Sequence, residues 1–165
     1  MSTRLRTGGR AERAACVDLW CTALDARDGH PPAAGTAQRA WTMLSADPLA
    51  FVVAEDDGLL QGFALVLPPG SGFATDPPEA AHLALLAVHP RAQGRGLARL
   101  LLSGAEEASA ARASSAVLHV LTANPGAVSL YTSAGWQPEG PPVPHPLSGA
   151  PMLTLVRSWG RAATP

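Results

Sequence analysis

The spacing of hydrophobic residues indicates two helices in the first third of the chain. Apolar side chains recur at helical intervals between residues 11 and 27, which predicts an amphipathic helix. A second, shorter helix is predicted over residues 37–44. It should end before Pro48, because a residue that precedes proline disfavours helical geometry. Trp20 and Trp41 occupy helical positions and are expected to pack in the core.

The pattern changes at residue 50 to continuous apolar segments, which indicate strands. Residues 50–54 and 59–67 form a predicted hairpin, because the Asp-Asp-Gly turn between them lets Gly58 adopt a positive φ. Residues 68–80 contain several prolines and glycines and are predicted to be a loop.

A buried strand, a helix and a second buried strand are predicted next. Residues 82–88 and 116–122 are mostly apolar, as in strands that are covered on both faces. Residues 96–111 between them repeat leucine and alanine at helical spacing. Two strands joined by a crossover helix pair in parallel. Since the earlier hairpin is antiparallel, the chain is predicted to be an α/β protein with a mixed sheet.

The end of the chain should add one helix and one strand. Asn124 followed by Pro125 is typical of a helix start, and Gly135 is well placed just beyond the end of that helix. Residues 138–151 hold six prolines and are expected to form an irregular loop. A strand at residues 152–157 is predicted to close the fold.

Composition excludes several classes of protein. The 165 residues are 47% hydrophobic and 15% charged, which is typical of a globular chain rather than a disordered one. We find no internal repeat and interpret residues 1–165 as a single domain. A net charge of -1 gives no general attraction to nucleic acid or to an anionic membrane. No segment approaches the ~18 apolar residues of a membrane span.

The cysteines indicate the cellular compartment, and the basic residues exclude two further classes of protein. Cys16 and Cys21 fall on different faces of the first predicted helix and are not expected to pair, which suits a reducing, cytoplasmic compartment. All 12 basic residues are arginine. The absence of lysine rules out a Walker phosphate loop and a Schiff-base enzyme, because both need a lysine amine.

The turn after residue 88 has the features of an anion site. Gly94 and Gly96 lead from a buried strand into an apolar helix, whose first amides lack partners within the helix and carry partial positive charge. Arg91, Arg95 and Arg99 add positive charge around this point. The sequence therefore predicts a pyrophosphate site, although a tight strand-to-helix turn without a ligand would use the same glycines.

A dinucleotide-binding fingerprint does not fit this turn. Starting at Gly94, it would place Arg99 where a glycine or alanine is needed, and Gly94 lies too far beyond the end of the strand. The pattern Gln/Arg-x-x-Gly-x-Gly/Ala fits residues 93–98 without a departure.

A second group of residues follows the strand at 116–122. It consists of Asn124, Ala127, Tyr131, Gly135 and Trp136. Together with the preceding glycine motif, this spacing resembles the GNAT superfamily of N-acetyltransferases, apart from a tryptophan where phenylalanine is usual.

The resemblance implies a GNAT-like fold, a central mixed sheet with helices on both faces. It implies acetyl-CoA as the co-substrate, bound in a gap where a bulge in the strand at 82–88 separates it from the next strand, and it implies no metal. The cofactor-binding residues it implies are Leu86, Ala87, Val88, Gln93, Gly94, Arg95, Gly96, Leu97, Ala98, Arg99, Asn124, Ala127 and Tyr131.

The resemblance also implies that Tyr131 is the general acid. Coenzyme A leaves as a thiolate, whose thiol form has a pKa of about 8.5, and a phenol with a pKa of about 10 can protonate it near neutral pH. Tyr131 is the only tyrosine in the chain.

A base is expected as well, because the attacking amine must be neutral. His119 is the first candidate: some members of the family carry a glutamate base at this position, and a free imidazole has a pKa of about 6.5. His82 is the second candidate and Glu79 the third. Each of the three could instead be an ordinary strand or surface residue.

The acceptor site is less well defined by the sequence. The resemblance places it between residues 25–35 and residues 138–150. Asp25 and Asp28, beside His30, could bind a cationic amine, although a solvated loop explains them equally well. The expected acceptor is a small-molecule amine or a peptide N-terminus. The proline-rich segment could act as a lid or as a homodimer contact.

Three hypotheses about function follow. The first is an enzyme that transfers the acetyl group of acetyl-CoA to a primary amine by direct attack. The second is a module that binds acyl-CoA without turnover, as a sensor or structural partner. The third is a nucleotide-binding domain of another class.

Overall fold

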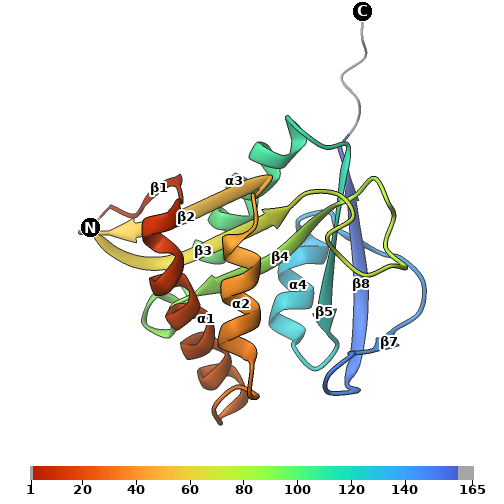
Figure 1. The fold of residues 1–165 in the computed structure, drawn as a ribbon, viewed down its shortest axis with the longest axis horizontal. Helices are drawn as coiled ribbons and strands as arrows, with labels where there is room; N and C mark the ends of the chain where they lie inside the picture. The colour runs from red at the N-terminus through yellow and green to blue at the C-terminus, as the bar shows by residue number, and fades with distance from the viewer. Residues whose placement is uncertain (1, 160–165) are drawn as a thin grey trace, which may run out of the picture.

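The computed structural model describes residues 2–159, which form one eight-stranded sheet with helices on both faces (Figure 1). The strands are β1 (Arg4–Thr7), β2 (Ala50–Asp56), β3 (Leu59–Leu67), β4 (Ala81–Val88), β5 (Ser115–Leu121), β6 (Gln137–Pro138), β7 (Val143–Pro144) and β8 (Pro151–Ser158). The helices are η1 (Arg10–Glu12), α1 (Arg13–Asp28), α2 (Thr36–Ser45), η2 (Pro90–Ala92), α3 (Leu97–Ala110) and α4 (Pro125–Ser133). The predicted mixed α/β fold is confirmed.

The sheet has the order β1-β2-β3-β4-β5-β8-β6, and β7 also pairs with β8. All pairs are antiparallel except β4 with β5, which are joined by the predicted crossover helix α3. Helices α1 and α2 lie on one face of the sheet and α3 lies on the other (Figure 1).

The side chains of β3 point alternately to the two faces of the sheet and contribute to the hydrophobic core on each face. Phe63 and Leu65 pack with α1 and α2, while Ala64 and Val66 pack with α3, and all four are buried. The prediction that Trp41 lies in the core is wrong: its side chain faces outward from α2 and is 43% exposed.

The structure adds strands that the sequence pattern did not reveal. β1 pairs with β2 at the edge of the sheet, and Arg6 on β1 binds Glu55 on β2 and Glu12 at 3.0 and 2.8 Å. This strand has a single apolar residue, Leu5, so it carried no hydrophobic signal. The two-residue strand β7 lies within the segment 138–151, which was predicted to be irregular throughout, and the two-residue strand β6 ends at its first residue, Pro138.

Strands β4 and β5 separate soon after they meet. They pair only at Ala81 with Ala116 and His82 with Val117. The β3–β4 register shifts between Leu65 and Val66, which inserts one extra residue into β4. The bulge and the gap that the family resemblance implied are therefore confirmed.

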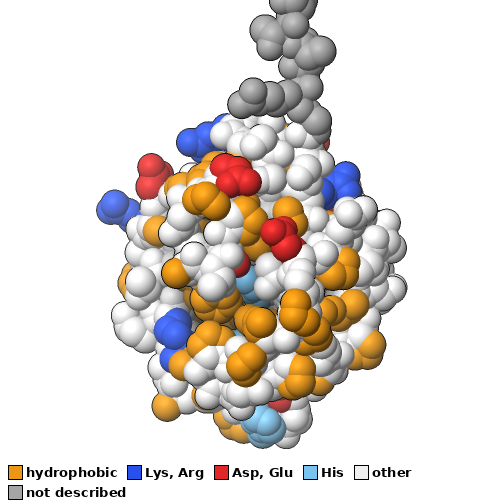
Figure 2. Space-filling view, turned by 90° about the vertical axis from the view of Figure 1, so that its right-hand side faces the viewer, with side chains coloured by type: hydrophobic (Ala, Val, Ile, Leu, Met, Phe, Trp, Pro, Cys, Tyr) orange, Lys and Arg blue, Asp and Glu red, His pale blue; other side chains and the backbone are white. Residues whose placement is uncertain are grey.

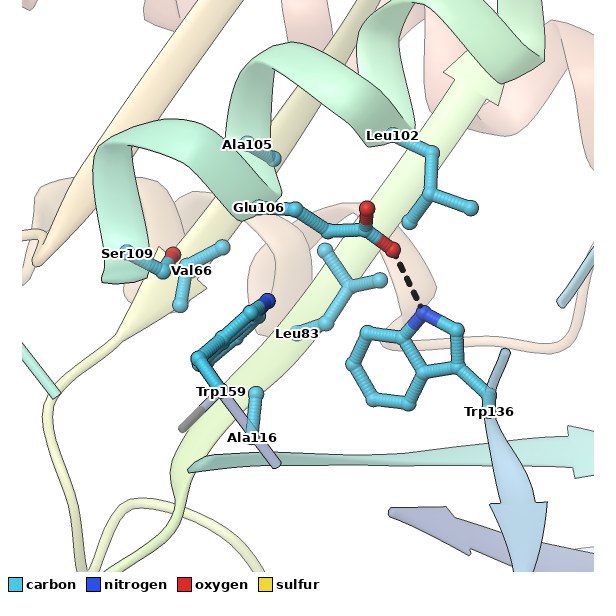
Figure 3. A pocket seen from close by; sticks show the side chains of 9 residues that line it. All are labelled: Val66, Leu83, Leu102, Ala105, Glu106, Ser109, Ala116, Trp136 and Trp159. Atoms are coloured by element: carbon cyan, nitrogen blue, oxygen red, sulfur yellow. Dashed lines mark hydrogen bonds between the residues drawn. The ribbon is translucent and has the colours of Figure 1, made fainter. Parts of the chain in front are cut away.

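Helix α3 packs closely against the sheet near Trp136. The indole of Trp136 donates to the Glu106 carboxylate at 2.7 Å, and Leu83 and Leu102 pack beside it (Figure 3). The void in this region measures about 10 Å³, enough for at most one water molecule. A substrate cannot bind there.

Candidate active site

The head of α3 is an open, glycine-lined turn. Gly94 and Gly96 have φ values of +78° and +76°, and a Cβ atom at either position would meet nothing within 4 Å. No side chain caps the helix at Gly96. Among residues 2–159, no group accepts a hydrogen bond from the backbone amides of residues 94–99. These amides and the space in front of them fit a diphosphate.

The neighbouring side chains hold the turn in shape. Gln93 Nε2 donates to the carbonyl of Val88 at 3.2 Å, so its amide stabilises the turn from within. Arg91 and Arg95 are exposed beside it. Arg99 donates to the hydroxyl of Ser133 and thereby links α3 to α4. The three arginines keep this end of the molecule positive.

The strand that leads into the turn has one unpaired edge. Leu86, Ala87 and Val88 pair with β3 on one side, but their other side has no pairing with β5. Gly62 on β3 permits the close packing here, because a Cβ atom would lie 2.8 Å from both the carbonyl oxygen of Ala87 and a methyl group of Leu101.

Helix α4 brings Asn124 and Tyr131 to the far side of the gap. Asn124 Oδ1 accepts from the amide of Ala127 at 3.3 Å, which confirms the predicted helix start. The ring of Tyr131 lies 6.2 Å from that of Trp136. Burial raises the pKa of Tyr131 to about 12, so the phenol is neutral over the physiological range.

His119 lies in a buried polar cluster on the face of the sheet opposite α3. Its Nε2 is 2.9 Å from Asp76 Oδ2, and its Nδ1 is 3.3 Å from the hydroxyl of Thr154. The side chains of His119 and Asp76 are only 9% and 6% exposed. The ring of Phe73 covers the histidine at a centroid distance of 4.4 Å. Sequence reasoning missed Asp76, because it lies 43 residues away in the segment predicted to be a loop.

His82 borders this cluster, whereas Glu79 does not. The rings of His82 and His119 are 5.8 Å apart. Burial, and to a lesser extent the charge of His119, lower the pKa of His82, and His82 Nδ1 is buried without a partner in the described residues. Glu79 is exposed, and the hydrogen-bonded pair at the centre of the cluster is His119 with Asp76 instead.

The predicted acceptor carboxylates lie on the last turns of α1. Asp25 and Asp28 belong to the helix rather than to the loop expected there. Arg27 donates to both oxygens of Asp28, at 2.7 and 3.0 Å, and lowers the pKa of that carboxyl. The interpretation of these residues as a solvated surface is therefore favoured.

The face at the right of Figure 1 contains a hollow. Figure 2 shows hydrophobic side chains gathered around this hollow, with acidic side chains among them and a histidine visible in its depth.

Comparison with known proteins identifies the family to which this chain belongs. Residues 14–136 match the model of the acetyltransferase (GNAT) family. The chain is 32% identical over 152 residues to the N-alpha-acetyltransferase RimI of Mycobacterium tuberculosis, covering 92% of this chain and 89% of that protein.

Two solved structures have the same fold over nearly their whole length. Salmonella typhimurium yncA, determined with its cofactor acetyl-CoA, superposes with a TM-score of 0.75 at 20% identity, covering 99% of this chain and 97% of that one. The ribosomal-protein-S18-alanine N-acetyltransferase of Escherichia coli gives 0.73 at 16% identity, covering 99% of each. With the family match over residues 14–136, these findings place the chain in the GNAT acetyltransferase family.

Proposed function

We propose that this protein transfers the acetyl group of acetyl-CoA to a primary amine by direct attack, acting as a single domain. The observation that carries the proposal is the unpartnered head of α3 at the end of the gap between β4 and β5. The open space at Gly94 and Gly96 fits the diphosphate of coenzyme A. The free edge at Leu86–Val88 is suited to the amide groups of its pantetheine arm.

The remaining binding residues would frame the same ligand. Arg95 and Arg99 supply charge at the diphosphate, Leu97 and Ala98 contribute first-turn amides, and Gln93 keeps the turn in shape. Asn124 and Ala127, at the start of α4, border the gap from its other side.

Tyr131 is the proposed general acid. When the amine displaces coenzyme A, the sulfur leaves with a negative charge and needs a proton. A phenol with a pKa of about 12 is fully protonated at neutral pH and can donate to a thiolate.

His119 is the preferred base, with His82 second. The demand on the base depends on the acceptor. A peptide α-amine has a pKa of about 7.7 to 8.0, so neutralising it at pH 7 costs only about 1 kcal/mol, against roughly 4 to 5 kcal/mol for an alkyl amine with a pKa near 10.4. An imidazole has only a moderate affinity for protons and is therefore better suited as a base for an α-amine than for an alkyl amine.

The acceptor class is proposed to be a peptide N-terminus, with a small-molecule amine as the alternative. The relative from Mycobacterium tuberculosis is an N-alpha-acetyltransferase, which supports a peptide α-amine as the acceptor. The carboxylates on α1 are already paired or solvated, which disfavours a polycationic acceptor.

The test is the Tyr131→Phe variant. It should lower kcat by ~10²–10⁴-fold, the usual contribution of a general acid, while the affinity for coenzyme A measured by calorimetry stays within a factor of about three. Thiol release would be followed with acetyl-CoA and a panel of short peptides and simple amines. Thr132→Val is the matched control, because it removes a hydroxyl from the next residue of α4, where it bonds only to the helix backbone.

Two outcomes would contradict the proposal. If the wild-type protein binds coenzyme A but releases no thiol with any amine, the module without turnover is the better description. If Tyr131→Phe and Thr132→Val both retain the wild-type rate, Tyr131 is not the acid.

A further inference from the structure

Three elements far apart in the sequence meet at His119. The loop between β3 and β4 supplies Asp76, β5 supplies the histidine, and β8 supplies Thr154. His119 and Thr154 are paired residues of neighbouring antiparallel strands, so their side chains lie on the same face. Asp76 Oδ2 also accepts from the amide of Phe73 at 2.8 Å, which fixes the loop while it holds the ring.

The partners of the ring determine where its proton lies. An ionised carboxylate can only accept hydrogen bonds, so the 2.9 Å contact requires a proton on Nε2 of His119. In the neutral ring, the lone pair is then on Nδ1, which faces the hydroxyl of Thr154. Asp76 therefore selects the tautomer in which Nδ1 is the basic atom.

Burial determines which end of this chain of groups is accessible. The carboxylate and the ring are almost completely covered, and Phe73 packs against the ring. Thr154 is only partly buried. The hydroxyl of Thr154 is the hydrogen-bond partner of Nδ1, so a proton can reach Nδ1 through it.

We propose that Thr154, His119 and Asp76 form a proton relay, in which Asp76 is a positioning residue and Thr154 is the group that takes the proton from the acceptor amine. The proposal rests on the proposed function. An N–H bond of the amine breaks and its proton joins Thr154 Oγ1, while the hydroxyl proton of Thr154 passes to Nδ1. The ring becomes an imidazolium, and its charge is balanced by Asp76, which stays ionised.

His82 keeps a second positive charge out of the cluster. The titratable groups that face His119 are Asp76 from the loop and His82 from β4, and β8 contributes only the uncharged Thr154. Because burial keeps His82 neutral near pH 7, the imidazolium of His119 faces one carboxylate and no opposing cation.

The test compares Asp76→Asn with Asp76→Glu in the full chain, with a peptide that begins with alanine as the acceptor. An asparagine amide can donate to Nε2, which moves the ring proton to Nδ1 and blocks the relay without removing the hydrogen bond. Asp76→Asn should lower kcat by at least ~10²-fold, shift the acidic limb of the kcat–pH profile, and leave KM for acetyl-CoA unchanged. Asp76→Glu should restore part of the rate.

A second pair of variants tests the hydroxyl. Thr154→Val keeps the shape of the side chain but cannot carry a proton, and it should lower kcat by ~10-fold or more. Thr154→Ser should retain most of the activity. Melting curves of all four variants separate loss of folding from loss of the relay.

The outcomes distinguish the relay from the proposed function. If His119→Gln loses the acidic limb but Asp76→Asn and Thr154→Val keep the wild-type rate and profile, the relay is wrong and the transferase proposal stands. If Asp76→Asn lowers only the melting temperature, Asp76 has a structural role alone. If the wild type acetylates no amine, the proposed function itself fails.

Discussion

The two ends of the candidate site are built from different parts of the chain. At the head of α3, the groups that would hold a ligand are backbone amides, and the glycines that expose them have empty space in front of them. At His119, the proposed catalytic groups are side chains, buried and bonded to one another across three elements. A backbone site tolerates changes of neighbouring side chains but not of its glycines, whereas a side-chain site fails when any single partner is lost.

The sharpest test of this contrast is Gly94→Ala. At a φ of +78° an added Cβ costs about 1–2 kcal/mol of backbone strain, and it also enters the space where a diphosphate would lie. We expect the affinity for coenzyme A, measured by calorimetry, to fall at least ~10-fold. Gly58→Ala is the matched control, because Gly58 has the same φ of +78° and the same empty surroundings but lies in the β2–β3 turn. Equal affinities in the two variants would show that the helix head does not hold the ligand.

A smaller effect is expected from the burial of His82, which lies beside the His119 cluster. The pKa of His82 is lowered in the folded protein, so the unfolded chain binds more protons near and below its ordinary value of 6.5. Stability from this group is therefore present above pH 6.5 and decreases as the pH falls toward the lowered pKa. Between pH 7.5 and 5.5, the melting temperature of His82→Leu should drop by a few degrees less than that of the wild type. An identical drop in both proteins would contradict the burial of a neutral imidazole.

The smallest effect is expected from the surface charges near the helix head. Arg95→Ala should weaken the binding of coenzyme A by only ~3-fold, since an exposed arginine contributes about 0.2–1 kcal/mol, and the difference should vanish in high salt. Arg112→Ala is the control, at the other end of α3, where the guanidinium binds the carbonyl of Leu49. If Arg95→Ala lowered the affinity for coenzyme A as much as Gly94→Ala, side chains rather than backbone amides would provide most of the binding energy at the head of α3 as well.

The same contrast explains what could be predicted from the sequence. The helix head is encoded within a few consecutive residues, and Asn124 with Tyr131 within one helix, so local patterns were sufficient. The cluster at His119 depends on Asp76, whose loop has no periodic pattern and reaches the histidine only through the tertiary fold. β1 was missed for a related reason, since a strand of alternating arginines is recognisable only by the partner that it pairs with.

The separation of β4 from β5 has one more consequence. A sheet normally has two outer edges, where unpaired backbone groups invite strands from other molecules. Here two further edges lie inside the sheet, beyond the pairs at Ala81 and His82. Only a slim, extended molecule can enter between two strands of one sheet, so a folded partner is excluded. In the proposed function, the pantetheine arm of the reactant completes the hydrogen-bond ladder that the polypeptide leaves unfinished.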